Sequence, residues 1–186
     1  GGFEDNPTDW TVPHWTFQRS KSEVAQDKEV FHGGAASARF RAKDHRAMLY
    51  SAINIEPNTR YKISGWIKTS GAKLAEIRVS KRKAGASVGE VSVGYVAGSK
   101  DWTYVETVFD SQDADGVRIW LWLLGTDPEI PAGIAWFDDI ALEENGTLQS
   151  PNLLKNSSFN LCTNAGIPDY WGIPPSAFFS VENWDS

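Results

Sequence analysis

Hydrophobic and polar residues alternate along most of this chain with a period of two positions. The alternation is clearest over residues 61–68, 76–80 and 134–142. The strongest apolar series occupies every second position of one stretch and consists of Val117, Ile119, Leu121 and Leu123. Such alternation is typical of antiparallel strands that bury one face.

Turn-forming residues separate these stretches at short intervals. Pro57-Asn58, Ser70-Gly71, Gly85 and Asp127-Pro128 are examples. No convincing stretch of ten or more residues shows the helical period, and the spacing indicates about ten short strands. We therefore predict an all-β fold, a β-sandwich of the jelly-roll type built from two antiparallel sheets.

The pattern divides the chain into one module, residues 1–144, and a C-terminal part, residues 145–186. The C-terminal part begins as a polar, turn-rich linker. It then repeats a feature of the chain's opening, because Phe3 precedes Trp15 by the same twelve positions that separate Phe159 from Trp171. Two interpretations stay open: a truncated start of a second, similar module, or a tail that folds back on the first.

Composition excludes several functional classes. The 186 residues carry a formal net charge of −6, which disfavours nucleic acid as a partner because nucleic-acid binding relies on clustered Lys and Arg. The single cysteine, Cys162, can form no internal disulfide. No apolar run is long enough to insert into a membrane. The chain starts at Gly1 rather than Met, from which we expect a piece of a longer, secreted or cell-surface polypeptide.

The sequence also lacks the short motifs that accompany common catalytic mechanisms. There is no Gly-x-Ser-x-Gly, no His-Glu-x-x-His and no phosphate-binding loop. Glycosidases need two carboxylates that flank the sugar, and no clustered acidic motif lies on a predicted strand. We therefore expect a protein without catalytic activity of its own.

Five short motifs in order point to a family. They are Gly2-Phe3-Glu4, His32-Gly-Gly-Ala-Ala-Ser37, Tyr61-x-x-Ser-x-Trp-x-Lys68, Trp102-Thr103 and Trp136-Phe-Asp-Asp-Ile140. Together they resemble carbohydrate-binding modules of the galactose-binding-like jelly-roll group, which includes families four, nine, sixteen and twenty-two. The resemblance implies a polysaccharide or oligosaccharide ligand, neighbouring modules in the same polypeptide, and an attached carbohydrate-active enzyme such as a glycoside hydrolase.

The resemblance also implies a structural calcium ion. In the related modules the motif glutamate and the first aspartate of the final strand are ligands, which correspond here to Glu4 and Asp138. Carboxylate and carbonyl oxygens suit this hard cation. Asp139 could replace Asp138, because the direction of the pleat is not readable from sequence with certainty.

Strand phase singles out a set of outward-facing side chains as the predicted sugar site. The set consists of Trp66, Trp120, Trp122, Arg78, Arg118 and Lys68. Indole rings stack on the apolar faces of sugars, and cationic side chains bind the hydroxyls. Alternatively, these tryptophans pack under a loop or under the C-terminal tail. The competing function is that of a structural or adhesion jelly-roll domain in a cell-surface or secreted protein.

Overall fold

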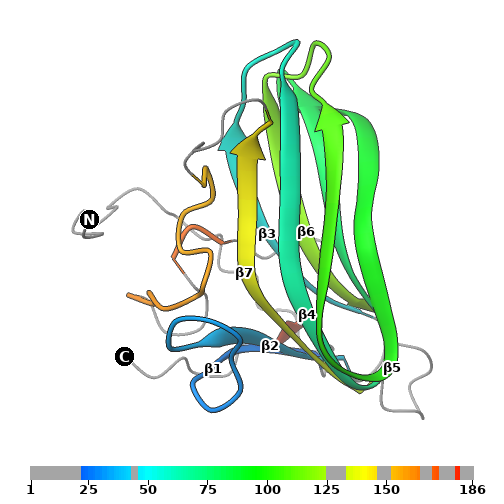
Figure 1. Cartoon of the computed structure of the whole chain (residues 1–186), viewed down its shortest axis with the longest axis vertical. Helices are drawn as coiled ribbons and strands as arrows, with labels where there is room; N and C mark the ends of the chain where they lie inside the picture. The colour runs from blue at the N-terminus through cyan, green and yellow to red at the C-terminus, as the bar shows by residue number, and fades with distance from the viewer. Residues whose placement is uncertain are drawn as a thin grey trace.

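The computed structural model describes residues 22–42, 46–124, 133–145, 152–163, 169–171 and 179–180. These residues form strands joined by turns (Figure 1). The strands are β1 (Ser22–Asp27), β2 (Ser37–Arg41), β3 (Arg46–Asn54), β4 (Arg60–Lys83), β5 (Ala86–Asp110), β6 (Gly116–Leu124), β7 (Ile134–Glu144) and β8 (Phe179–Ser180). No helix occurs in the described residues, and the prediction of an all-β fold is confirmed.

The strands follow the order β3-β6-β4-β7-β2-β1-β8, and β5 pairs with β4. Every pairing is antiparallel except the short parallel contact between β1 and β8. β4 is the central strand of this arrangement because it pairs with β5, β6 and β7.

The long strands β4 and β5 bend back on themselves, as the lower end of Figure 1 shows. The first arm of β4 (residues 60–69) pairs with β7, and the second arm (residues 74–82) pairs with β6. Register shifts interrupt the hairpin between the arms, where Gly71 and Gly98 have φ of 65° and 75°. Glycine adopts this left-handed conformation without the steric penalty that other residues incur. The bend folds one continuous sheet into the two layers of the predicted sandwich.

We call the layer with β7, β2, β1 and the first arm of β4 the first layer. The second layer contains β3, β6 and the second arm of β4, and each layer also includes the arm of β5 that pairs with its arm of β4. Two glycines let the layers approach closely. A Cβ on Gly65 would lie 2.8 Å from Cδ1 of Ile77 on the opposite layer, and a Cβ on Gly94 would lie 2.8 Å from Cβ of Val105. Each glycine therefore makes room for a β-branched side chain of the facing layer.

The core fills the space between the layers with aliphatic and aromatic side chains. The predicted inward series on β6 is confirmed, since Val117, Ile119, Leu121 and Leu123 are at most 1% exposed. The tail contributes Leu154, Phe159 and Trp171 to the same core. The orange segment beside β7 in Figure 1 is the described part of this tail around Phe159.

Candidate functional site

The predicted sugar-binding residues lie on the outer faces of two different layers. Trp66 and Lys68 belong to the first arm of β4, which pairs with β7 in the first layer. The other four belong to the second layer and are Arg78, Arg118, Trp120 and Trp122. The outer faces of a sandwich point in opposite directions, so one ligand chain cannot lie on both at once.

The second layer aligns aromatic and charged side chains across three strands. Trp120 on β6 is paired with Tyr50 on β3 and with Arg78 on β4, and Trp122 is paired with Glu76. Directly paired residues point to the same side of a sheet and contact each other. We call this surface the Trp120 face and define it by Tyr50, Glu76, Arg78, Arg118, Trp120 and Trp122.

The rings of the Trp120 face form a continuous row. The ring centroids of Tyr50 and Trp120 lie 5.0 Å apart, and those of Trp120 and Trp122 lie 6.5 Å apart. Both tryptophans are half-buried. The row is fixed by cross-strand register and not by loops, so the rings keep their relative positions as long as the sheet is intact.

Arg78 is held in place by two carboxylates and an indole ring. Its guanidinium lies 3.0 Å from Glu76 and 2.9 Å from Glu90, and its Cζ lies 4.7 Å from the centre of the Trp122 ring. Burial by itself would lower the pKa of Arg78, but the charges and hydrogen bonds of Glu76 and Glu90 outweigh it and raise the pKa above its usual value. The guanidinium is therefore charged and already ordered.

The three rings differ in what covers them. Arg78 and Arg46 lie over the Trp122 ring, and Arg118 lies 5.2 Å from the centre of the Tyr50 ring. Among the described residues, Trp120 has no guanidinium over its ring. The Nε1 atom of Trp122 is buried and has no acceptor in the described part of the chain. Among the described residues, the face thus combines one ring without a guanidinium over it with one N–H donor that lacks an acceptor.

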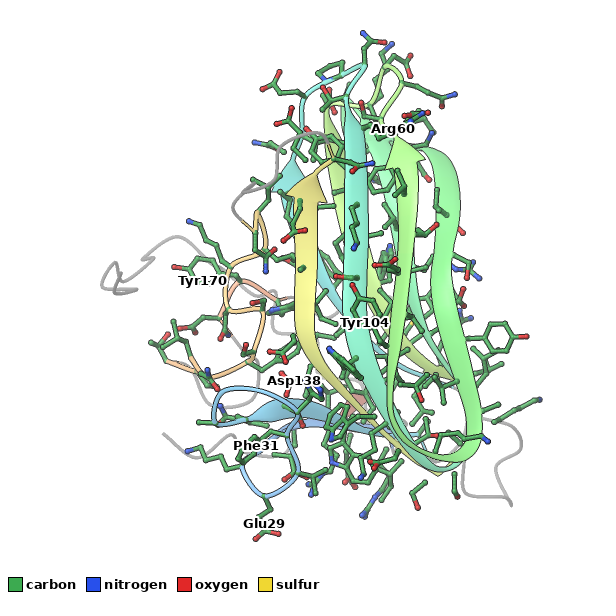
Figure 2. All side chains as sticks on the ribbon, viewed as in Figure 1. Glu29, Phe31, Arg60, Tyr104, Asp138 and Tyr170 are labelled. Carbon is green, nitrogen blue, oxygen red and sulfur yellow. The ribbon has the colours of Figure 1, made fainter. Side chains whose placement is uncertain are left out.

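The first layer has a different arrangement, which we call the Trp66 face: Trp66, Lys68, Trp102 and Tyr104. The imidazole ring of His32 stacks on Trp66, with centroids 3.9 Å apart and planes 18° apart. Tyr104, labelled in Figure 2, is 44% exposed and lies 5.2 Å from the Trp66 ring. Lys68 forms an ion pair of 2.6 Å with Asp101. One side of Trp66 is therefore covered by the segment that follows β1.

Asp138 anchors the segment that covers Trp66, and Figure 2 shows it between β7 and the turn after β1. Its carboxylate is fully buried and accepts the backbone N–H groups of His32 (2.7 Å) and Gly33 (3.1 Å) on Oδ2. Oδ1 accepts the N–H of Asp139 at 2.8 Å. Burial raises the pKa of Asp138 to about 6, against the lowering effect of these hydrogen bonds.

These contacts also bear on the predicted calcium site. Asp138 directs its oxygens at N–H donors, and the Asp139 carboxylate contacts Nδ1 of His32 (2.8 Å) and accepts the hydroxyl of Ser158 (3.0 Å). No group of three or more His, Cys, Asp or Glu in the described residues could hold a metal ion. Glu4 lies outside the described residues. The described residues do not test the calcium site, which stays a prediction that depends on Glu4.

Sequence reasoning identified the outward tryptophans but missed their partners. Tyr50 and Glu90 were not predicted, because their place beside Trp120 and Arg78 depends on how β3 and β5 pair with their neighbours. His32 was known only as part of a motif, and nothing local indicates that its ring covers Trp66.

In the part of the chain that the structure describes, no helix is long and apolar enough to cross a membrane.

Comparison with known proteins gives a family and a fold. The family model described as a carbohydrate binding domain matches residues 1–127. The chain is similar in structure to tailspike protein 4 of bacteriophage CBA120, with a TM-score of 0.53, 13% identity, and coverage of 67% of this chain and 18% of that one. It is also similar to a xylan-binding domain from CBM 22, with a TM-score of 0.51, 15% identity, and coverage of 70% and 87%. At these identities the likeness shows the fold alone.

Curated relatives are much longer proteins. The tRNA nuclease WapA of Bacillus subtilis (strain 168) is 26% identical over 195 residues, a match that covers 100% of this chain and 8% of the relative. The tRNA3(Ser)-specific nuclease WapA of Bacillus spizizenii gives the same identity and coverage. The chain therefore spans about 8% of the length of the curated relatives that it matches.

Proposed function

The chain belongs to the carbohydrate binding domain family, and from this membership we propose that its Trp120 face binds a polysaccharide without catalysing a reaction on it. The observation that supports this choice of face is the row of Tyr50, Trp120 and Trp122, in which Trp120 has no cation over its ring among the described residues. Aromatic rings on the outer face of a sheet are a common feature of ligand-binding surfaces.

The side chains around Trp120 suit the chemistry of a sugar chain. A pyranose ring has apolar C–H faces that stack on an indole, and its rim of hydroxyls both donates and accepts hydrogen bonds. Arg78 supplies ordered N–H donors, while Glu76 and Glu90 supply acceptors. The buried Nε1 of Trp122 is a donor without an acceptor in the described part of the chain.

The Trp66 face is a weaker candidate for the same role. His32 already stacks on Trp66, so a ligand would first have to displace the imidazole ring. Displacement subtracts from the binding free energy. We therefore assign the role of Trp66 and Lys68, both predicted to bind ligand, to packing on the first layer.

We further propose that binding holds a larger, extracellular polypeptide at a polysaccharide surface. The curated relatives are far longer than this chain, which supports a module within a larger protein. They are named as nucleases, so the glycoside hydrolase expected as the attached enzyme stays a prediction. Binding to polysaccharide is the part of the proposal that concerns this chain alone.

The proposal is tested by affinity electrophoresis in gels that contain soluble plant, algal and bacterial polysaccharides. The wild-type protein should be retarded by at least one polymer. Trp120→Ala should weaken that binding by tenfold or more, equivalent to about 1.4 kcal/mol, because the stacking surface is removed. Trp66→Ala is the matched control and should leave retardation unchanged.

The fold of both variants is checked by thermal unfolding followed by circular dichroism. Loss of binding in Trp66→Ala with retention in Trp120→Ala would move the site to the first layer. Unretarded migration of the wild-type protein in every gel would contradict sugar binding and favour the structural or adhesion function.

The calcium prediction has its own test. If Glu4 and Asp138 hold an ion, calcium should raise the melting temperature of the wild-type protein and EDTA should lower it. Glu4→Gln should remove that difference. Equal melting temperatures of the wild-type protein in calcium and in EDTA would contradict the prediction.

A further inference from the structure

The tail, of which the structure describes residues 152–163 and 169–171, fills an open strand edge of β7. Beyond residue 138, β7 has no pairing with β2. There the N–H of Ile140 donates to the carbonyl of Ser157 (3.2 Å), and the N–H of Leu153 donates to the carbonyl of Leu142 (2.7 Å). The tail thereby continues the first layer by satisfying backbone groups that an uncovered edge would leave unpaired.

Two aromatic side chains anchor the tail in the core. Phe159 is fully buried, Trp171 is 2% exposed, and their ring centroids lie 4.9 Å apart. Asn156 sets their relative position: its side chain donates to the carbonyls of Leu161 (2.7 Å) and Asp169 (3.0 Å), and its own carbonyl accepts Nε1–H of Trp171 (3.2 Å). The tail therefore has its own hydrogen bonds and places two buried rings in the core, in addition to pairing with the edge of β7.

Residues from both layers contact the tail. We call the place where the tail lies the tail groove. Gln26 on β1 donates to the carbonyl of Phe159 (2.6 Å), and Ser51 on β3 donates to the carbonyl of Tyr170 (2.9 Å). The N–H of Ala35 donates to the side-chain oxygen of Asn160 (3.2 Å). Since β1 belongs to the first layer and β3 to the second, the tail closes the side of the sandwich between them.

The sequence contains a second segment with the same anchors. The opening has Phe3 and Trp15 twelve positions apart, as Phe159 and Trp171 are in the tail. Aligned in this way, Glu4 corresponds to Asn160, and a carboxylate oxygen can accept the Ala35 N–H as the amide oxygen of Asn160 does. The family match, residues 1–127, includes the opening and leaves the tail outside. The core nevertheless receives two of its largest buried side chains from the tail.

We propose that the tail groove is a docking site for segments with a Phe and a Trp twelve positions apart, and that the opening of the chain, residues 2–15, is its second occupant. The two segments compete, since one pair of ring positions holds one Phe and one Trp. When the opening docks, the tail is released and can fill the groove of a second copy, which joins consecutive modules edge to edge. The Trp120 face lies on the outer side of the second layer, so this joint does not depend on the proposed sugar binding.

The competition can be measured in the whole chain by disulfide trapping. Cys162→Ser removes the native thiol. Glu4→Cys, Ala35→Cys and Asn160→Cys then place one thiol on each segment and one on the rim of the groove. After oxidation at equilibrium, peptide mapping by mass spectrometry gives the ratio of the 4–35 link to the 35–160 link. Non-reducing electrophoresis shows whether a link lies within one chain or joins two.

Both links should form, and the anchors should control their ratio. Phe159→Ala should raise the share of the 4–35 link tenfold or more, and Phe3→Ala should lower it by a similar factor, because each removes a large buried side chain from one competitor. A 4–35 link within one chain is the expected result and identifies the chain's own opening as the occupant. A 4–35 link found only between chains would identify the opening of a second copy instead and would overturn the proposal.

Thr8→Cys in place of Glu4→Cys is the control for random collision. Three further results would overturn the proposal: a 4–35 link no more frequent than the 8–35 link, exclusive 35–160 linkage even with Phe159→Ala, or no link to position 35 at all. Thermal unfolding of each variant before oxidation establishes that the sandwich is intact.

Discussion

The two outer faces of the sandwich carry similar aromatic and cationic side chains, but different groups lie over their rings. On the Trp66 face an imidazole covers the indole, and the lysine beside it is paired with an exposed aspartate. On the Trp120 face the rings are aligned by strand register and an ordered guanidinium stacks on one of them. The comparison teaches that the number of aromatic residues on a face does not identify a binding surface. The groups that lie over each ring are the better guide to a binding surface.

The cause of the difference lies in the connections between strands. The segment that follows β1 turns over the first layer because the buried carboxylate of Asp138 binds its backbone at His32 and Gly33. On the second layer, β6 lies between β3 and the second arm of β4. Its outward rings contact side chains of those neighbouring strands. We therefore propose that the first face is a packing surface and that the second binds the ligand.

Removal of the Asp138 carboxylate should have the largest effect on stability. It should also distinguish the two faces, because it acts on the Trp66 face and not on the Trp120 face. Asp138→Ala leaves three part-buried N–H groups without their acceptor, and we expect a loss of about 3 kcal/mol in the free energy of unfolding. Polysaccharide affinity should be unchanged at temperatures where the variant is folded. Urea denaturation and affinity electrophoresis measure the two quantities. Asp139→Asn is the matched control and should have a much smaller effect on stability; equal effects of the two substitutions would contradict the role given to Asp138.

Removal of the Arg78 guanidinium should weaken the Trp120 face itself. Arg78→Leu leaves Glu76, which is 6% exposed, without its cation, and we expect a stability loss of about 2 kcal/mol. Affinity for the polysaccharide should fall at the same time, because the ordered donors are lost. Lys83→Leu removes an exposed ion pair with Asp113 and should change neither quantity measurably. A variant at Arg78 that loses stability but keeps full affinity would show that Arg78 supports the sheet and does not contact the ligand.

Acidification should affect the first layer through Asp27. Burial alone would raise the pKa of Asp27, but hydrogen bonds from Trp136, Val30 and Glu29 and the charge of Arg39 hold it below the ordinary 3.8. The unfolded chain therefore takes up a proton before the folded one does. The stabilisation is present above pH 3.8 and is lost as the pH falls through 3.8 and then through the lower folded value. Melting temperatures between about pH 6 and about pH 3 should fall more steeply for the wild-type protein than for Asp27→Asn. Parallel curves would contradict this assignment.

Removal of the His32 imidazole that covers Trp66 should have the smallest effect on stability. His32→Ala deletes one stacked pair and should lower the free energy of unfolding by about 1 kcal/mol. Trp66 should become more accessible, which acrylamide quenching of tryptophan fluorescence detects as an increase over the wild-type value. Binding through the Trp120 face should not change. If His32→Ala instead creates a second binding event, cover by His32 is what keeps the first layer from binding sugar.

The sequence by itself determined the phase of the strands and the class of the fold. The period of two placed Val117 and Leu121 inside and Trp120 and Trp122 outside, and the structure has them so. Phase is readable because successive side chains of a strand point to opposite faces whatever the strand pairs with. Ordered motifs such as Tyr61-x-x-Ser-x-Trp-x-Lys68 added the family, which the comparison confirmed.

Only the tertiary structure decided which outward residues share a face and which of them are covered. Trp66 and Arg78 lie on one strand, yet the bend near Gly71 places them on opposite layers. The stack of His32 on Trp66 and the pairing of Tyr50 with Trp120 join residues far apart in the chain. Register, layer and cover follow from the pairing of distant segments and from the volume that they fill together. A local pattern of hydrophobic and polar positions contains no information on which distant segments pair or on the volume that they fill.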